Sequence, residues 1–219
     1  MGKIVAVASH KGGVGKSTLL ISMVVCVILK GKQACVLECD KQHSIKDFLS
    51  DRAENGITPE IPYQECYSDI PERARKLADK YDYVFIDTPG RQSAEFIKAL
   101  TCADLLLSFV EPGSGIEINT LGQLVYDVKT AQAGLNPDLK AWIVLNKCST
   151  SPSDTEASEL RQQLNDDPDW LPVPRQRIFQ RTAHKRAYNS GMGVHEYNDK
   201  SGNKARGEIE LLLKEIELI

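Results

Sequence analysis

The chain has 219 residues, of which 42% are hydrophobic and 26% are charged, as in an ordinary soluble globular protein with one sizeable core. The net charge of −3 gives no overall attraction to nucleic acid or to an acidic membrane, so any such binding would need a local patch. The longest apolar stretch, Leu19–Leu29, is too short to span a membrane. The six cysteines include no C-x-x-C pair, and Met1-Gly2-Lys3 leads into a strand without a signal peptide. We therefore expect a reduced, cytoplasmic protein.

Short apolar runs alternate with segments of helical periodicity along the chain. Strands are predicted at Ile4–Ala8, Ala34–Leu37, Tyr83–Ile86, Leu105–Val110 and Ala141–Leu145. Helices are predicted at Lys16–Lys30, Ile70–Lys80, Ser93–Leu100, Ile116–Ala131, Ser153–Leu164 and Lys204–Leu218. Nearly unbroken apolar strands are typical of parallel sheets covered on both faces. The order predicts an α/β fold in a single domain, residues 1–219: a doubly wound, mostly parallel sheet with helices on both faces and ligand at the carboxyl ends of the strands.

The first predicted strand leads into a glycine-rich stretch, SHKGGVGKST at 9–18. It almost matches the phosphate-loop pattern G-x-x-x-x-G-K-[ST], but His10 stands at the first glycine and Lys11 is an additional lysine. Glycines let backbone amides approach phosphate, and the start of the following helix favours an anion. A plain turn does not explain three glycines, two lysines and two hydroxyls in eight residues. The residues expected to hold a nucleotide are Lys11, Gly12, Gly13, Val14, Gly15, Lys16, Ser17 and Thr18.

Individual roles follow from the phosphate-loop pattern. Lys16 is expected to reach the β- and γ-phosphates, Ser17 to ligate Mg²⁺, and Thr18 to contact the α-phosphate. A second metal partner is Asp87, which ends the apolar run in YDYVFIDTPG and can hold Mg²⁺ through water. Another strand end, VLECDKQHS, carries Glu38 and Asp40. Asp40 is expected near Mg²⁺ and as the group that orients or deprotonates the attacking water. Glu38 either assists near the metal or belongs to a charged turn.

These motifs resemble those of the ParA/MinD family of P-loop ATPases. KGGVGKST at 11–18 is similar to its deviant Walker A signature, ECDKQ at 38–42 to its first switch, and FIDTPG at 85–90 to its Walker B and second switch. The segments QRIFQRTAHKRAYNSGMGVHEYN and KARGEIELLLKEIELI resemble the closing region of short plasmid-partition ATPases of the ParF type. Glu38 replaces the family's usual Asp and Lys41 its usual Pro, which affects the geometry of the first switch.

The resemblance implies an ATPase that uses ATP and Mg²⁺ and that becomes a homodimer when ATP binds. In this family the signature lysine, here Lys11, reaches the partner subunit's ATP, so that Lys11, Lys16 and Asp40 form the catalytic set. A lysine on phosphate charge that grows during transfer would act as an arginine finger does. The resemblance also implies slow intrinsic turnover, a ParB-like centromere-binding partner and an association with the nucleoid.

Residues 172–190 carry five arginines or lysines and no carboxylate. Such a patch suits nonspecific binding of the DNA backbone; the alternative is a solvated helix face paired with the acidic stretch Asp154–Asp169. No separate helix-turn-helix domain is expected ahead of a phosphate loop that starts at residue 9. The candidate DNA-binding residues are Arg175, Arg177, Arg181, Lys185 and Arg186.

Several alternatives remain beside a partition ATPase. LNKC at 145–148 resembles the start of an N-K-x-D guanine motif, but Ser149 replaces its Asp, so Asn146 is expected to approach adenine or to support its pocket. A MinD-like, membrane-cycling ATPase would need a basic amphipathic tail, whereas Gly207–Ile219 is acidic, so no membrane partner is expected. A ParA-like ATPase that positions a protein cargo, and a nucleotide-gated DNA-binding dimer with little turnover, stay open.

Overall fold

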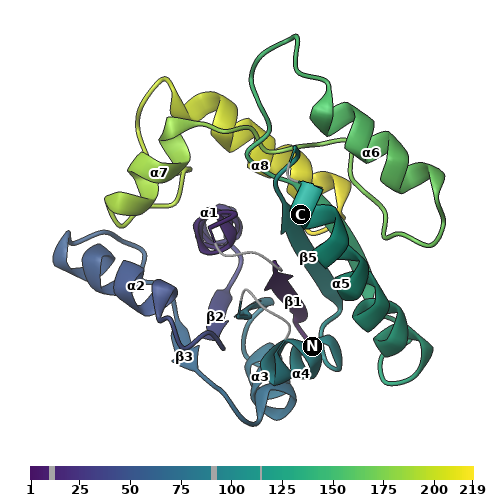
Figure 1. Cartoon of the computed structure of the whole chain (residues 1–219). Coiled ribbons are helices and arrows are strands. Elements are labelled where there is room, and N and C mark those ends of the chain that lie inside the picture. The colour runs from purple at the N-terminus through teal and green to yellow at the C-terminus, as the bar shows by residue number, and fades with distance from the viewer. Residues whose placement is uncertain (10–12, 90–92, 114) are drawn as a thin grey trace.

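The computed structural model describes residues 1–9, 13–89, 93–113 and 115–219, with the backbone alone for 115–120. Strands and helices alternate through most of the chain (Figure 1). The strands are β1 (Lys3–Ala8), β2 (Ala34–Glu38), β3 (Tyr63–Glu65), β4 (Tyr83–Asp87), β5 (Leu105–Val110) and β6 (Lys140–Leu145). The helices are α1 (Lys16–Leu29), α2 (Ser44–Glu54), α3 (Ile70–Ala78), α4 (Ala94–Leu100), α5 (Gly115–Ala133), α6 (Glu156–Asp166), α7 (Thr182–Asn189) and α8 (Gly202–Glu215).

The strands form one parallel sheet in the order β3-β2-β4-β1-β5-β6. β1 therefore lies between β4 and β5, which follow it much later in the chain, and the direction of winding reverses beside it. In a doubly wound sheet, ligands bind at the carboxyl ends of the strands next to such a reversal. The carboxyl end of β1 leads directly to the glycine-rich loop and α1, so the topology puts the candidate phosphate loop at this point.

Alternate residues of each strand face two hydrophobic cores, as the period of two in a strand requires. In β1, Val5 and Val7 pack with α1, α2, α7 and α8. Ile4 and Ala6 pack on the opposite face with α3, α4, α5 and α6. Both faces of the sheet are therefore covered (Figure 1), which confirms the predicted fold class and explains why the strands other than the short edge strand β3 have no polar face.

The predicted elements match observed ones within a few residues at each end, and β5 matches at both ends. Three elements were not predicted: α2, β3 and α7. β3 has only three residues at the sheet edge, none of them buried, so it carries no hydrophobic pattern. α2 buries Ile45 and Phe48, but is otherwise mostly polar and follows a non-standard N-cap residue, His43. Within the described ranges, none of the helices has the length and apolar character needed to cross a membrane.

Candidate functional site: a phosphate loop beside a pocket

The described end of the loop before α1, residues 13–15, has the backbone geometry that its glycines predict. Gly13 and Gly15 have φ of 82° and 86°, in the left-handed region that residues with a Cβ rarely adopt. A Cβ at Gly15 would also stand 3.0 Å from the side-chain nitrogen of Asn146. Gly15 is the N-cap residue of α1, so the amides of the first helical turn face this loop. Of the predicted loop residues, Lys11 and Gly12 lie outside the described residues.

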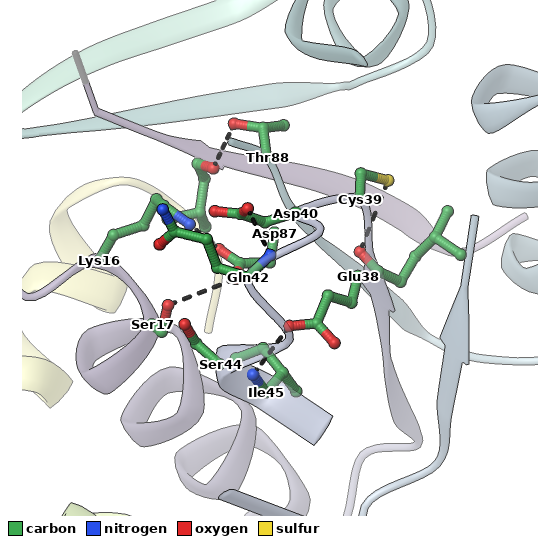
Figure 2. Close-up of polar contacts among 12 residues, drawn as sticks. Lys16, Ser17, Glu38, Cys39, Asp40, Gln42, Ser44, Ile45, Asp87 and Thr88 are labelled. Carbon is green, nitrogen blue, oxygen red and sulfur yellow. Dashed lines mark hydrogen bonds and ion pairs between the residues drawn. The ribbon is translucent and has the colours of Figure 1, made fainter. Parts of the chain in front are cut away.

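Lys16 and Ser17 meet Asp87 where α1 begins and β4 ends (Figure 2). The Lys16 ammonium donates to one carboxylate oxygen of Asp87, and the Ser17 hydroxyl lies 3.3 Å from the other. Asp87 is 0% exposed and Lys16 is 8% exposed. Burial raises the pKa of the Asp87 carboxyl, and the charge of Lys16 opposes that rise. A buried carboxylate needs a cation beside it. The oxygens of Asp87 and Ser17 are also ligands that Mg²⁺ prefers.

Asp40 lies in the loop that follows β2, and the charges of Glu38 and Asp40 both raise the pKa of the Asp87 carboxyl further. Asp40 is 9% exposed. One of its carboxylate oxygens accepts from the backbone nitrogen of Gln42 at 3.0 Å, which fixes the side chain against its own loop. Figure 2 shows the side chain of Asp40 close to those of Asp87 and Lys16. The predicted catalytic and metal residues Lys16, Ser17, Asp40 and Asp87 are therefore brought together.

Glu38 has a different environment from Asp40, although only Cys39 separates them. Its carboxylate is 0% exposed and accepts from the backbone nitrogen of Ile45 at 2.8 Å and that of Lys46 at 3.3 Å. The hydroxyl of Tyr63 donates to it as well. Glu38 thus turns toward the start of α2 (Figure 2). These hydrogen bonds favour the second of the two readings that the sequence left open, in which Glu38 is a charged residue of the turn.

A pocket of about 480 Å³ opens beside the phosphate loop. The loop and α1 provide one wall, the segment after β6 a second, and residues 179–189 a third. Its volume is in the range of small-molecule sites. The pocket adjoins the N-terminus of α1, where the phosphate loop ends. The lining residues are Gly13, Gly15, Thr18, Leu19, Asn146, Lys147, Phe179, Gln180, Arg181, Thr182, His184, Lys185, Tyr188 and Asn189.

Asn146 joins this pocket to the phosphate loop. Its side-chain nitrogen donates to the carbonyl of Val14, and its backbone nitrogen donates to Val110 of β5 at 2.8 Å. The residue is almost completely buried and lines the pocket. Asn146 thereby links the phosphate loop to the end of β5. The neighbouring Lys147 also lines the pocket.

The five cations predicted to bind DNA have different surroundings. Arg181 donates to Glu208 at 2.8 Å through Nε, and both Arg177 and Arg181 lie over the ring of Phe179, at 5.4 and 5.3 Å from its centroid. The side chains of Arg175, Lys185 and Arg186 are exposed. The segment is helical only from Thr182 to Asn189, and the carboxylate that engages Arg181 belongs to α8, not to the acidic stretch Asp154–Asp169.

Several pocket residues were not singled out from the sequence as nucleotide contacts, among them Phe179, His184 and Tyr188. They lie more than 160 positions from the phosphate loop, and their approach depends on a parallel contact between Cys148 and Phe179 beside β6. The signal that could have found them is the placement of LNKC at the carboxyl end of a strand, next to the loop in the predicted sheet.

With this geometry, the chain can be compared with known proteins. A model of the CobQ/CobB/MinD/ParA nucleotide binding domain matches residues 5–194. An uncharacterized ATP-binding protein of Methanocaldococcus jannaschii is 32% identical over 139 residues, 50% of this chain and 53% of that protein. The chromosome partitioning protein ParA of Myxococcus xanthus is 24% identical over 180 residues, 64% of this chain and 62% of that protein. The matches thus span between half and two thirds of the length of these two relatives.

Longer matches at lower identity complete the comparison. Maintenance of carboxysome distribution protein A of Gloeobacter kilaueensis is 23% identical over 217 residues, 98% of this chain and 94% of that protein. The structure of a variant of Cyanothece McdA in complex with ATP superposes with a TM-score of 0.78 at 16% identity, and covers 100% of this chain and 97% of that one. The family model covers most of the chain, including the phosphate loop, Asp40, Asp87 and the pocket walls. The chain therefore belongs to the CobQ/CobB/MinD/ParA family of nucleotide-binding domains and is related to the ParA-type partition ATPases within it.

Proposed function

We propose that the protein is an ATPase that moves or segregates a cargo by cycling between nucleotide states. The observation that carries the proposal is the meeting of Lys16, Ser17 and the buried Asp87 at the start of α1, the helix that also lines a pocket of about 480 Å³ through Thr18 and Leu19. The phosphate loop would hold the phosphates of ATP, and the pocket would hold its base and ribose. Ser17 and Asp87 offer oxygen ligands for Mg²⁺, which when bound would neutralise phosphate charge.

Hydrolysis needs an oriented water, and Asp40 is the carboxylate available for that role. It lies beside Asp87 on a loop that its own carboxylate helps to fix. Lys16 would stabilise the negative charge that develops on the transferred phosphoryl group. Lys11 would add a second cation, supplied to the partner subunit's ATP, which rests on the resemblance of KGGVGKST to the signature of the ParA/MinD family. Turnover by the single chain would then be slow, and ATP would act as a dimerisation switch.

The ATP-bound dimer would bind DNA without sequence preference, in the cytoplasm and on the nucleoid. Exposed Arg175, Lys185 and Arg186 support this step, because flexible cations suit the phosphate backbone. Arg177 and Arg181 would contribute less, since both lie against Phe179 and Arg181 also engages Glu208. A ParB-like centromere-binding protein would stimulate hydrolysis and return the chain to its monomeric form, so that the cargo would be a plasmid or another DNA molecule.

The proposal is tested by light scattering coupled to size exclusion, with ADP or with ATP and Mg²⁺, each with and without random-sequence DNA. We expect a monomer with ADP and a DNA-bound dimer with ATP. Lys11→Ala should keep ATP binding and lose the dimer. Lys3→Ala, an exposed lysine at the opposite end of β1, is the charge-matched control. A chain that stays monomeric with ATP would contradict the dimer switch, and a dimer that ignores DNA would contradict the DNA step alone.

A second candidate function is the positioning of a protein cargo on the nucleoid. It is favoured by the match over 98% of the chain to a protein named for carboxysome distribution. The chemistry would be the same, so the two candidates differ only in the adaptor and in what is carried. Deletion in the native host separates them: plasmid loss supports DNA partition, whereas a clustered protein assembly with normal plasmid inheritance supports protein positioning.

A further inference from the structure

The loop that carries Asp40 is bridged by the side chain of Glu38. β2 ends at Glu38 and α2 begins at Ser44, so the loop comprises residues 39–43. At its start, the backbone nitrogen of Cys39 donates to the carbonyl of Asp87 at 2.8 Å. Beyond its end, the amides of Ile45 and Lys46 donate to the Glu38 carboxylate. Glu38 therefore ties the last residue before the loop to the first turn of the helix after it.

This bridge stabilises a loop whose backbone conformation is unfavourable at His43. His43, which precedes α2, has φ of 55°, a left-handed conformation that residues with a Cβ seldom adopt. Among the described residues, the side chain of His43, the N-cap residue, makes no capping hydrogen bond to the amides of α2. Helix amides left without such a cap need another acceptor. Glu38 supplies that acceptor, and its negative charge lies where the helix dipole favours one.

Tyr63 of the edge strand holds Glu38 in place from the other side. Its hydroxyl donates to the Glu38 carboxylate, and burial, followed by this hydrogen bond, raises its pKa far above the ordinary value of a phenol. Tyr63 therefore remains a donor at every physiological pH. A contact between α2 and β3, Lys46 with Glu65 at 2.9 Å, is exposed to solvent on the lysine side and contributes little by comparison.

We propose that Glu38 and Tyr63 are positioning residues that fix Asp40 for ATP hydrolysis without contacting the nucleotide. The inference rests on the proposed function, and it assigns a role to Glu38, which differs from the Asp usual in ParA/MinD proteins. The longer side chain of Glu38 reaches the amides beyond the loop. The edge strand β3, which packs little hydrophobic surface, is paired with β2 through its backbone, and Tyr63 adds a side-chain contact with Glu38.

The test is Tyr63→Phe, which removes one hydroxyl and leaves the ring in place. We expect kcat for ATP to fall about tenfold, because a hydrogen bond to a charged group is lost, while KM changes less than about twofold. Hydrogen exchange of the Ile45 and Lys46 amides should become faster, and other amides should be unchanged. If Tyr63 contributed only to overall stability, exchange would become faster at many amides. Tyr83→Phe is the matched control, since its hydroxyl donates to Leu218 at the far end of the sheet.

Glu38→Gln provides the second variant. This substitution keeps the size of the side chain and an acceptor oxygen but removes the charge. Its kcat should therefore be lower than that of the unaltered chain and higher than that of Glu38→Ala. Unchanged kcat in Tyr63→Phe, or a raised KM with unchanged kcat, would overturn the positioning role and leave the ATPase proposal intact. Absence of ATP turnover in the unaltered chain would overturn the ATPase proposal first and this inference with it.

Discussion

Among single residues, Asp87 has the environment that most constrains what the site can hold. Its carboxylate is inaccessible to water and lies in contact with the ammonium of Lys16. A charge removed from water is expensive unless an opposite charge or several hydrogen bonds compensate for it. Lys16 therefore keeps the buried carboxylate compatible with the fold, and under the proposed function it would have a second task, to bind phosphate.

Lys16→Ala should separate these two tasks. We expect ATP affinity to fall by more than about 100-fold and the free energy of unfolding to fall by about 3 kcal/mol, since Asp87 loses its cation. Adding Asp87→Asn should restore most of the stability but none of the ATP binding. Urea denaturation and isothermal titration calorimetry measure the two quantities. Tight ATP binding by the single variant would refute the assignment of the phosphate loop.

His184 is a second residue with an unusual environment. Its ring is 8% exposed, and neither ring nitrogen has a hydrogen-bond partner among the described residues. Burial, followed by the charges of Arg181 and His195, lowers its pKa from 6.5 to about 4. The unfolded chain therefore binds a proton at this residue below pH 6.5, whereas the folded chain does not until about pH 4.

The linkage predicts an acid-dependent loss of stability. Between pH 6.5 and about pH 4, His184 should lower the free energy of unfolding by about 3 kcal/mol in total, with no effect above that window. His184→Phe should flatten this part of the curve, while His43→Asn, at a half-exposed position, should leave it in place. Denaturant melts at several pH values provide the measurement, and an unchanged slope in His184→Phe would assign the acid sensitivity elsewhere.

At the scale of elements, α7 connects the pocket to the rest of the fold. Arg181, just before α7, engages Glu208 of α8, and Glu208 also accepts from the backbone nitrogen of Phe179 at 3.2 Å. At the other end of the helix, the hydroxyl of Tyr188 donates to the carbonyl of Ser44 at 2.8 Å, where α2 begins. Hydrogen bonds thereby fix this wall of the pocket to α8 and to the start of α2.

Glu208→Ala should loosen this wall. It leaves a backbone amide and a guanidinium without their acceptor, so we expect a loss of about 2 kcal/mol in the free energy of unfolding and weaker ATP binding. Glu208→Gln keeps an acceptor and should lose less than about 1 kcal/mol. Thermal unfolding with and without ATP measures both effects. Equal losses in the two variants would mean that the charge of Glu208, not its hydrogen bonds, fixes the segment.

At the scale of the whole molecule, the distribution of charge is more informative than its sum. The chain carries −3 overall, yet Arg175 and Arg186 are exposed in a segment without carboxylates. Neither residue lines the pocket, so they can be changed without touching the candidate nucleotide site. Substitutions of these two arginines therefore test DNA binding separately from nucleotide binding.

Arg175→Ala combined with Arg186→Ala should weaken binding of random-sequence DNA in the presence of ATP. The dependence of log affinity on log salt should become shallower by about two, one for each lost phosphate contact. Lys76→Ala with Lys80→Ala removes the same charge beside α3, on the other face of the sheet, and should have little effect. Fluorescence anisotropy across a salt series measures this, and equal losses in both pairs would show that only net charge matters.

The sequence predicted the parts of this protein that are encoded locally. Buried parallel strands are continuous apolar runs, so β5 was found at both of its ends, and the sheet followed from the alternation of strands with helices. The phosphate loop was evident because its glycines, lysine and hydroxyls are contiguous. Asp40 and Asp87 could be predicted to lie close together because Asp87 ends β4 and Asp40 follows the end of β2, and the carboxyl ends of parallel strands meet at one edge.

Tertiary structure decided the features that join distant segments. The sequence left two readings for Glu38, and only the approach of α2 and β3 turns its carboxylate toward Ile45 and Tyr63. The cations of 175–186 formed one run in the sequence, but Glu208 engages Arg181, whereas Arg175 and Arg186 remain exposed. Local pattern fixes which residues are buried, while the partner of a buried or half-buried charge depends on long-range packing.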